Sequence, residues 1–447
     1  MRRRRVDPAR RVAFDALRAV HADDAYANLA IANLLRERRI SGRDAAFATE
    51  LVAGTCRMQH SYDAIIEAAS GRKPNTLQPA MLDILRLGTH QLLGMRVPTH
   101  AAVTATVDLA SSAVGERVSG LTNAVLRKVS ARPYQEWVDQ LTVGLDGLDR
   151  LALQHAHPRW VVEAFADLLP ADELDSALAA DNLAPQTSLV VRPTLLDSAE
   201  LVAAGGVPGR LSPFAVTWPG NPADSAAVRS GTAGVQDEGS QLVAWALARG
   251  EAAPGWWLDL CAGPGGKTAL LAGLASHQGS RVLANEVSPH RAKLVADAVR
   301  AFGREQVALV VGDGTRPAWR AGSFPRVLAD VPCSGLGSLR RRPESRWRRG
   351  PESVEELHPL QLALLREALE AAAPGGLVAY VTCSPHRRET TDVIEEVLAD
   401  RPDVSVQPAA TLLPEVVDAE RGDFLQLWPH RHGTDAMFAA YLRVGRD

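Results

Sequence analysis

Two cysteines and an aspartate each follow an apolar, β-favouring segment in the second half of the chain. Asp330 and Cys333 belong to the tetrapeptide Asp-Val-Pro-Cys, and Cys383 follows the apolar segment 377–382. A thiolate that adds to carbon 6 of a cytosine converts the ring into an enamine, whose carbon 5 can attack an electrophilic methyl group. The reaction also needs an acid near ring nitrogen 3 and a group that later allows the proton on carbon 5 to leave. One cysteine could serve for the whole reaction, but two cysteines allow one to attack the base and the other to assist release of the product.

A glycine-rich turn lies between an apolar segment at 256–260 and an Ala/Leu-rich helix expected from Lys267. Backbone N–H groups in such a strand, turn and helix face a ligand above the strand. Glu286 ends the next expected strand, about 20 residues further on, where a carboxylate usually binds ribose hydroxyls. These two features predict a nucleotide or nucleoside site, and a purely structural glycine turn is the alternative.

The same turn argues against two common ligands. Cys261 stands where the first glycine of a triphosphate loop belongs, and Thr268 stands where a dinucleotide fingerprint has its third glycine. S-adenosylmethionine has a ribose and no phosphate, and it fits a shorter turn followed by a carboxylate. The turn therefore favours this cofactor.

Alternating strands and helices are expected from residue 256 onward, and they would bring these residues together. The expected strands are 256–260, 281–287, 307–311, 326–330 and 377–382, and the expected helices between them are 267–275, 289–302 and 354–373. Such alternation predicts a parallel sheet covered on both faces, with the ligand at the carboxyl ends of the strands. Segments 424–428 and 436–444 are expected to close the sheet as an antiparallel hairpin.

Apolar residues recur at spacings of three and four from Asp7 to about Ser130, which predicts an all-α bundle. Between about Ala131 and Gly234 the periodicity weakens and turn residues increase. We expect helices at 160–169 and 171–180 and a short strand at 187–191, as in a small α+β module. The predicted domains are therefore the bundle at 1–135, the module at 136–234 and the α/β domain at 235–447.

Composition is that of an ordinary soluble globular protein, with 46% apolar residues, 23% charged residues and a net charge of −3. Nucleic-acid contact would have to come from the local basic patches at Arg2–Arg5 and Arg340–Arg349. The four cysteines are widely spaced and suggest neither a disulfide framework nor a metal site. No apolar run is long enough to span a bilayer, and we expect a cytoplasmic monomer.

Short motifs in the helical segment resemble those of the NusB family of RNA-binding transcription factors. They are Arg10 to Ala16, Asp44 to Val52, Leu85-Arg86-Leu87-Gly88, Val97-Pro98 and Thr122 to Arg127. The resemblance implies RNA contact through the arginine-rich amino end. A solvated tail is the alternative for Arg2–Arg5, because runs of charge usually are solvated.

The motifs of the second half resemble those of bacterial RNA (cytosine-5)-methyltransferases, and with the NusB-like bundle in front the chain resembles the RsmB branch, which modifies small-subunit (16S) ribosomal RNA. The resemblance implies a class I S-adenosylmethionine-dependent methyltransferase fold and no metal. It implies that Cys383 is the nucleophile, that Cys333 assists release, and that Asp330 is a catalytic acid steered by Lys267. The implied cofactor-binding residues are Cys261, Ala262, Gly263, Pro264, Gly265, Gly266, Lys267, Glu286, Asp313 and Asp330. DNA cytosine methyltransferases have their nucleophile in a Pro-Cys pair, which would be Cys333, and the tripeptide at 382–384 favours RNA.

An arginine-rich segment, 337–349, lies between the two cysteines. With Trp347 among its arginines, we expect it to neutralise phosphates and stack a base beside the site, and a solvated loop is the alternative. The predicted activity is methylation of carbon 5 of a cytosine in 16S ribosomal RNA, free or in an early assembly particle. The alternatives are a transfer RNA substrate, or an RNA-binding assembly factor without activity.

Overall fold

Helices dominate the first part of the chain, as the apolar spacing predicts. A computed structural model describes residues 6–445 of the 447. Helix α1 begins where the Asp7 side chain accepts a hydrogen bond from the backbone N–H of Arg10, and Pro8 occupies its first turn. The helices are α1 (Pro8–Ala22), α2 (Ala27–Glu37), α3 (Gly42–Arg57), α4 (Gln59–Ser70), α5 (Pro79–Leu93), α6 (Thr99–Ala113), α7 (Ser119–Val129), α8 (Tyr134–Leu141), α9 (Gly147–Gln154), α10 (Arg159–Ala166) and α11 (Leu174–Ala180).

These helices form the first of two compact units. The first unit contains the residues up to Leu183 together with Leu339–Arg348, and the second contains Ala184–Ser338 and the residues from Arg349 onward. One buried cluster joins α1, α2 and α3, another joins α4, α7 and α8, and α5 contributes to both. The predicted all-α bundle is thereby confirmed.

A small antiparallel sheet opens the second unit. Its strand order is β2-β3-β1-β4, with β1 (Ser188–Val191) paired to both β3 (Ala215–Thr217) and β4 (Ala233–Val235), and β2 (Val207–Pro208) at the edge. Helices α12 (Ser198–Ala203) and α13 (Ala226–Ser230) accompany it. The predicted middle module at 136–234 thus contributes helices to the first unit and this sheet to the second. Its boundaries as an independently folding domain stay a prediction.

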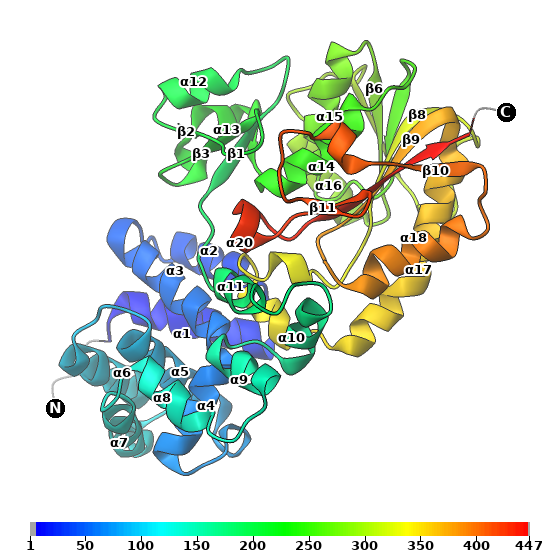
Figure 1. Ribbon diagram of the computed structural model, residues 1–447. Helices are drawn as coiled ribbons and strands as arrows, with labels where there is room; N and C mark the ends of the chain where they lie inside the picture. Colours follow the sequence, from blue (N-terminus) through cyan, green and yellow to red (C-terminus); the bar gives the residue numbers. More distant parts are fainter. Residues whose placement is uncertain (1–5, 446–447) are drawn as a thin grey trace. The chain divides into compact units, whose positions relative to one another are not determined.

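The second unit is built around a large mixed sheet, drawn from green to red in Figure 1. The strand order is β11-β12-β13-β9-β8-β5-β6-β7, and β10 pairs with β13. Strands β9, β8, β5, β6 and β7 are parallel, and the strands from β10 to β13 pair antiparallel. The strands are β5 (Trp256–Asp259), β6 (Arg281–Glu286), β7 (Val307–Val311), β8 (Phe324–Asp330), β9 (Ala372–Thr382), β10 (Val404–Gln407), β11 (Glu420–Arg421), β12 (Phe424–Gln426) and β13 (Phe438–Val444).

Helices cover both faces of this sheet because successive strand residues point to opposite sides. Trp257 packs with α14 (Glu238–Arg249) and α15 (Gly266–His277), whereas the adjacent Leu258 packs with α17 (Pro351–Ala371) and α18 (Thr391–Leu398). Helix α16 (Pro289–Ala298) packs against β6 and β7. The predicted α/β sheet of the class I methyltransferase type, closed by an antiparallel hairpin, is confirmed.

Strand order reverses between β5 and β8, which makes their carboxyl ends the expected ligand site. The chain runs from β5 outward through β6 to β7, and then returns to the other side of β5 for β8 and β9. The chain therefore leaves β5 and β8 toward opposite sides, and open α/β sheets generally bind their ligands at such a point.

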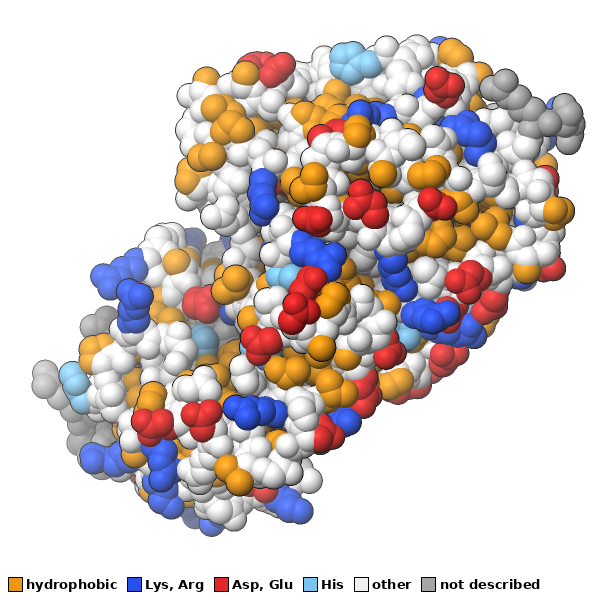
Figure 2. All heavy atoms as spheres, in the orientation of Figure 1, with side chains coloured by type: hydrophobic (Ala, Val, Ile, Leu, Met, Phe, Trp, Pro, Cys, Tyr) orange, Lys and Arg blue, Asp and Glu red, His pale blue; other side chains and the backbone are white. Residues whose placement is uncertain are grey.

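Charged side chains of both signs are interspersed on the face of the molecule drawn in Figure 2, in agreement with the net charge of −3. Within residues 6–445, no helix combines the length and the apolar composition that a bilayer crossing requires.

Candidate active site

The predicted site residues follow the carboxyl ends of five neighbouring parallel strands. Cys261–Lys267 connect β5 to α15, Glu286 ends β6, Asp313 follows β7, Asp330 ends β8, and Cys383 follows β9. The structure brings three pairs of these residues into contact, which are described below. Asp313 is the exception, because its exposed carboxylate accepts hydrogen bonds from the backbone N–H and the hydroxyl of Thr315.

The glycine turn is bound to the end of β6. The backbone N–H of Gly263 donates to Glu286 Oε2 at 2.9 Å, and Ser288 N–H donates to Oε1 of the same carboxylate at 2.9 Å. A Cβ atom at Gly263 would overlap the Glu286 carboxylate and the Arg291 guanidinium, so a larger residue here would have to displace both side chains. Gly265 has φ of +104°, and a Cβ there would lie 2.6 Å from the Cβ of Ala298. Packing within the protein therefore favours glycine at both positions, independently of any bound ligand.

Two residues around the turn were not predicted from the sequence. Arg291, in the first turn of α16, donates to the carbonyl oxygen of Gly263 at 2.5 Å and lies 3.7 Å from Glu286 Oε2. Asp259 accepts a hydrogen bond from the hydroxyl of Thr268 at 2.6 Å, and burial raises the pKa of Asp259 to about 7. The position of Arg291, in the first turn of the helix that directly follows the Glu286 strand, is the signal that could have identified it.

Lys267 and Asp330 form an ion pair, with the Nζ atom 2.8 Å from Oδ2. Burial alone would lower the pKa of the Lys267 ammonium, but the attraction and hydrogen bond to Asp330, together with the nearby Cys383 and Asp259, outweigh burial and raise this pKa. Lys267 therefore stays charged and holds Asp330 at the end of β8.

Cys333 and Cys383 lie side by side, with their Sγ atoms 3.3 Å apart and both residues half-buried. The hydrogen bond with Cys333 lowers the pKa of the Cys383 thiol, and the nearby Lys267 ammonium lowers it further. The same contact raises the pKa of Cys333 well above its ordinary value, and burial adds to this. The contact between the two thiols therefore shifts their pKa values in opposite directions.

The other two cysteines have surroundings that favour packing. Cys56 is buried in α3, and burial raises its pKa to about 12. Cys261 packs against the apolar cluster under α17, and burial raises its pKa. Among the described residues, no group of three or more His, Cys, Asp and Glu side chains is placed to hold a metal ion.

The arginine-rich segment has a different place from the one predicted. Arg346 is fully buried in the first unit, where its guanidinium donates to the carbonyl oxygen of Ala156 and to Oδ1 of Asn182, both at 3.0 Å. Trp347 donates its indole N–H to the carbonyl oxygen of Cys56 at 2.7 Å, and its ring stacks on His60. The predictions of phosphate binding and of a solvated loop are both wrong for Arg346, and the Trp347 ring already has a stacking partner.

Comparison with known proteins follows the same division of the chain. The family model described as 16S rRNA methyltransferase RsmB/F matches residues 246–443, which run from α14 to β13. The Escherichia coli protein named ribosomal RNA small subunit methyltransferase B is 30% identical over 410 residues, which cover 87% of this chain and 90% of that protein. The chain belongs to the RsmB/F family of 16S rRNA methyltransferases. It is an RNA methyltransferase, and the predicted family is confirmed.

Other relatives extend this family assignment along the whole chain. The NusB family model matches residues 7–131, which contain α1 to α7. The Mycobacterium tuberculosis protein Rv1407, which carries the name of a methyltransferase, is 51% identical over 99% of this chain and 98% of its own length. The crystal structure of PH0851 has the same fold, with a TM-score of 0.80 at 24% identity over 99% of this chain and 100% of that chain. The RNA contact predicted for Arg2–Arg5 lies outside the described residues.

Proposed function

We propose that this enzyme methylates carbon 5 of a cytosine in small-subunit ribosomal RNA, with S-adenosylmethionine as the methyl donor and a covalent bond between Cys383 and carbon 6 of the base. The observation that carries the proposal is the pair of sulfur atoms 3.3 Å apart, beside the Lys267–Asp330 ion pair. A methyltransferase that acts on a nitrogen or a ribose oxygen has no need of two adjacent thiols. The names of the relatives support ribosomal RNA as the substrate, free or in an early assembly particle.

The residues around the glycine turn fit S-adenosylmethionine. Because Gly263 has no side chain, its backbone lies directly beside the Glu286 carboxylate at the end of β6. Val287 and Val311, which follow β6 and end β7, are 63% and 52% exposed and offer apolar surface for an adenine ring. We assign the ribose hydroxyls to Glu286, the adenine side to Asp313, and the methionine side to Cys261–Lys267. When bound, this cofactor supplies the electrophilic methyl group that carbon 5 takes.

The chemistry on the base is carried by four side chains. The Cys383 thiolate adds to carbon 6, so a sulfur–carbon bond forms and the electron pair of the ring double bond moves toward carbon 5. The Lys267–Asp330 pair holds a proton that stabilises the charge developing at nitrogen 3. After carbon 5 carries its methyl group, its remaining proton passes to a water molecule, and Cys333 assists this release. The electron pair then restores the ring double bond and expels the Cys383 thiolate.

Transfer of a radiolabelled methyl group to unmodified 16S ribosomal RNA tests the proposal, with wild type, Cys383→Ala and Cys333→Ala compared on a denaturing gel. We expect Cys383→Ala to lose activity by about a thousandfold or more, because it lacks the nucleophile. Cys333→Ala should accumulate a covalent protein–RNA adduct, because release is blocked. Cys56→Ala, which changes a cysteine outside the site, is the control and should label RNA like wild type.

Two outcomes would contradict the proposal in different ways. If Cys333→Ala abolishes labelling and Cys383→Ala traps the adduct, the roles of the two cysteines are reversed. If wild type labels transfer RNA and not ribosomal RNA, the substrate is wrong and the chemistry stands. Digestion of the labelled RNA to nucleosides identifies 5-methylcytidine directly.

A further inference from the structure

A fully buried carboxylate lies directly behind the two cysteines. Glu389 ends the short 3₁₀ helix η6 (Arg387–Glu389) and has no exposed surface. Its Oε1 accepts the backbone N–H of Ser334 at 2.7 Å, and its Oε2 accepts the Ser334 hydroxyl at 2.5 Å. Both oxygens therefore hold the residue that follows Cys333 in the chain.

The residue that precedes Cys333 is tied to the same carboxylate through Gln361 of α17. The amide nitrogen of Gln361 donates to the carbonyl oxygen of Pro332 at 2.9 Å and lies 3.2 Å from Glu389 Oε1. Hydrogen bonds to a carboxylate are stronger than those between neutral groups. Hydrogen bonds therefore hold the chain on both sides of Cys333, at Pro332 and at Ser334.

The turn that carries Cys383 meets the same group of contacts. The Ser334 hydroxyl lies 3.2 Å from the Ser384 hydroxyl, and the backbone N–H of Gly337 donates to the carbonyl oxygen of Cys383 at 2.8 Å. Glu389 is also linked to β9 directly, because Tyr380 donates its hydroxyl to the Glu389 carbonyl oxygen at 2.8 Å. Glu389 therefore connects the two turns, with its carboxylate acting through Ser334 and its backbone carbonyl through Tyr380.

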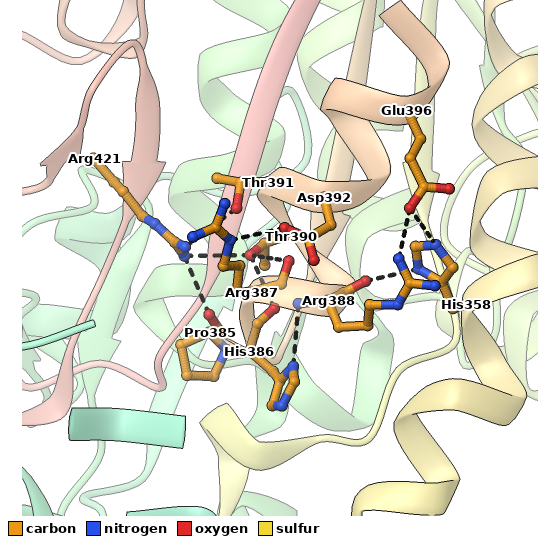
Figure 3. A network of polar contacts seen from close by, with 10 residues as sticks. All are labelled: His358, Pro385, His386, Arg387, Arg388, Thr390, Thr391, Asp392, Glu396 and Arg421. Carbon is orange, nitrogen blue, oxygen red and sulfur yellow. Dashed lines mark hydrogen bonds and ion pairs between the residues drawn. The ribbon is translucent and has the colours of Figure 1, made fainter. Parts of the chain in front are cut away.

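Residues on either side of Glu389 are fastened by surrounding elements, as Figure 3 shows. Arg421 of β11 donates to the carbonyl oxygen of Pro385 at 3.1 Å and lies 3.2 Å from the Thr390 hydroxyl. On the other side, His358 Nδ1 lies 2.8 Å from the carbonyl oxygen of Arg388. Because the backbone on both sides is held, the Glu389 side chain has a fixed position from which to hold the cysteine turns.

We propose that Glu389 is a positioning residue that holds the Cys333 turn against the Cys383 turn and so maintains the close approach of the two sulfur atoms. The inference rests on the proposed function for its catalytic consequence, and the sulfur separation itself can be measured without RNA. Glu389 touches neither sulfur and acts through Ser334, Gln361 and the backbone.

Disulfide formation in the full-length protein measures this positioning. Diamide takes two electrons and two protons from a pair of thiols, so that one sulfur–sulfur bond forms and diamide is reduced to the hydrazine. Wild type should form the Cys333–Cys383 disulfide rapidly, as detected by mass spectrometry of the linked peptides. Glu389→Gln has nearly the same shape, but its amide nitrogen cannot accept a hydrogen bond from Ser334, and we expect it to form this disulfide about tenfold more slowly.

Methyl transfer gives a second readout that loss of folding would not reproduce. We expect kcat of Glu389→Gln to fall about tenfold while KM for S-adenosylmethionine stays unchanged, because the hydrogen bonds of the Glu389 side chain go to Ser334 and Gln361 and not to the cofactor loop at 261–267. Glu389→Asp keeps the carboxylate and should recover part of both rates. Glu395→Gln, which changes an exposed glutamate on α18, is the matched control and should behave like wild type.

Disulfide formation and kcat at wild-type levels in Glu389→Gln would overturn the proposal. If this variant yields little folded protein, Ser334→Ala removes one contact of the same carboxylate. A slower disulfide in Ser334→Ala then supports the proposal, and an unchanged rate overturns it. Rapid disulfide formation in a wild-type protein that methylates no RNA would contradict the proposed function and leave the positioning role intact.

Discussion

At the scale of single residues, the groups around the two thiols give them different pKa values. Cys383 has a lowered pKa because Cys333 is hydrogen-bonded to it and the Lys267 ammonium is close, whereas the pKa of Cys333 is raised. The thiolate is the reactive form of cysteine, so the direction of these pKa shifts supports the proposal that Cys383 is the attacking residue. Lys267 influences both Cys383 and Asp330, because its ammonium group also forms an ion pair with Asp330.

Lys267→Met is expected to move the reactivity of Cys383 to higher pH. The variant removes the cation that lowers the pKa of Cys383 and leaves the negative charge of Asp330, which raises it. The rate of alkylation of Cys383 by iodoacetamide, followed by peptide mass spectrometry against pH, measures the change. Lys293→Met, at an exposed position of α16, is the control, and identical pH profiles for Lys267→Met and wild type would contradict the prediction.

At the scale of elements, a short segment from between β8 and α17 belongs to the helical unit. Leu339–Arg348 includes the 3₁₀ helix η5 (Pro343–Trp347) and packs on α3. Glu344 accepts the backbone N–H of Ala27 at 3.2 Å, and Arg348 donates to the carbonyl oxygens of Val20 and Ala25. The segment thus completes the interior of the bundle, and its arginines satisfy carbonyl groups that would otherwise be buried without partners.

Arg346→Ala should lower the free energy of unfolding by about 3 kcal/mol, because it empties a buried volume and leaves carbonyl oxygens without donors. Urea unfolding of the full chain measures this loss. Arg349→Ala, at an exposed position just beyond the segment, should change stability by less than about 0.5 kcal/mol. Equal effects of the two substitutions would show that the segment is not held as the structure indicates.

At the scale of the whole molecule, buried titratable groups in the two units should make opposite contributions to the pH dependence of stability. Burial lowers the pKa values of His60, His90 and His157 in the first unit, so acid protonates them more readily in the unfolded chain. This unit loses stability as pH falls below the ordinary histidine pKa, about 6.5. In the second unit, the pKa of Asp259 is raised to about 7, so the folded chain holds this proton more tightly than the unfolded chain does. The resulting stabilisation is complete below the ordinary pKa of 3.8 and is lost as pH rises toward 7.

His157 offers the sharpest test of this pH dependence, because it is fully buried and its pKa is lowered well below the ordinary value. Between about pH 6.5 and 5 we expect the melting temperature of the helical unit to fall in wild type, since unfolding takes up a proton. His157→Leu should show a smaller fall over the same range, whatever its melting temperature at neutral pH. A slope equal to that of wild type would contradict the prediction. Differential scanning calorimetry measures both slopes.

The sequence by itself determined the elements and the chemical groups of this protein. Apolar spacing predicts the helices up to about Ser130, and the alternation after Trp256 predicts the parallel sheet, because both patterns are local consequences of which face of an element is buried. Motifs that end strands also place Lys267, Asp330, Cys333 and Cys383 at one edge, since carboxyl ends of parallel strands share that edge. The minor strands β10 and β11 escaped prediction because they are short and carry no clear period.

Only the tertiary structure decided which of these groups touch and which are buried. Arg346 and Trp347 read as an exposed basic segment, and they are enclosed because acceptors from Cys56, Ala156 and Asn182 surround them. Glu389 gives no sequence signal of its own, since its function depends on Ser334, 55 residues away along the chain. Burial and hydrogen bonding between distant residues depend on how the chain folds back on itself, and a local sequence pattern does not encode that.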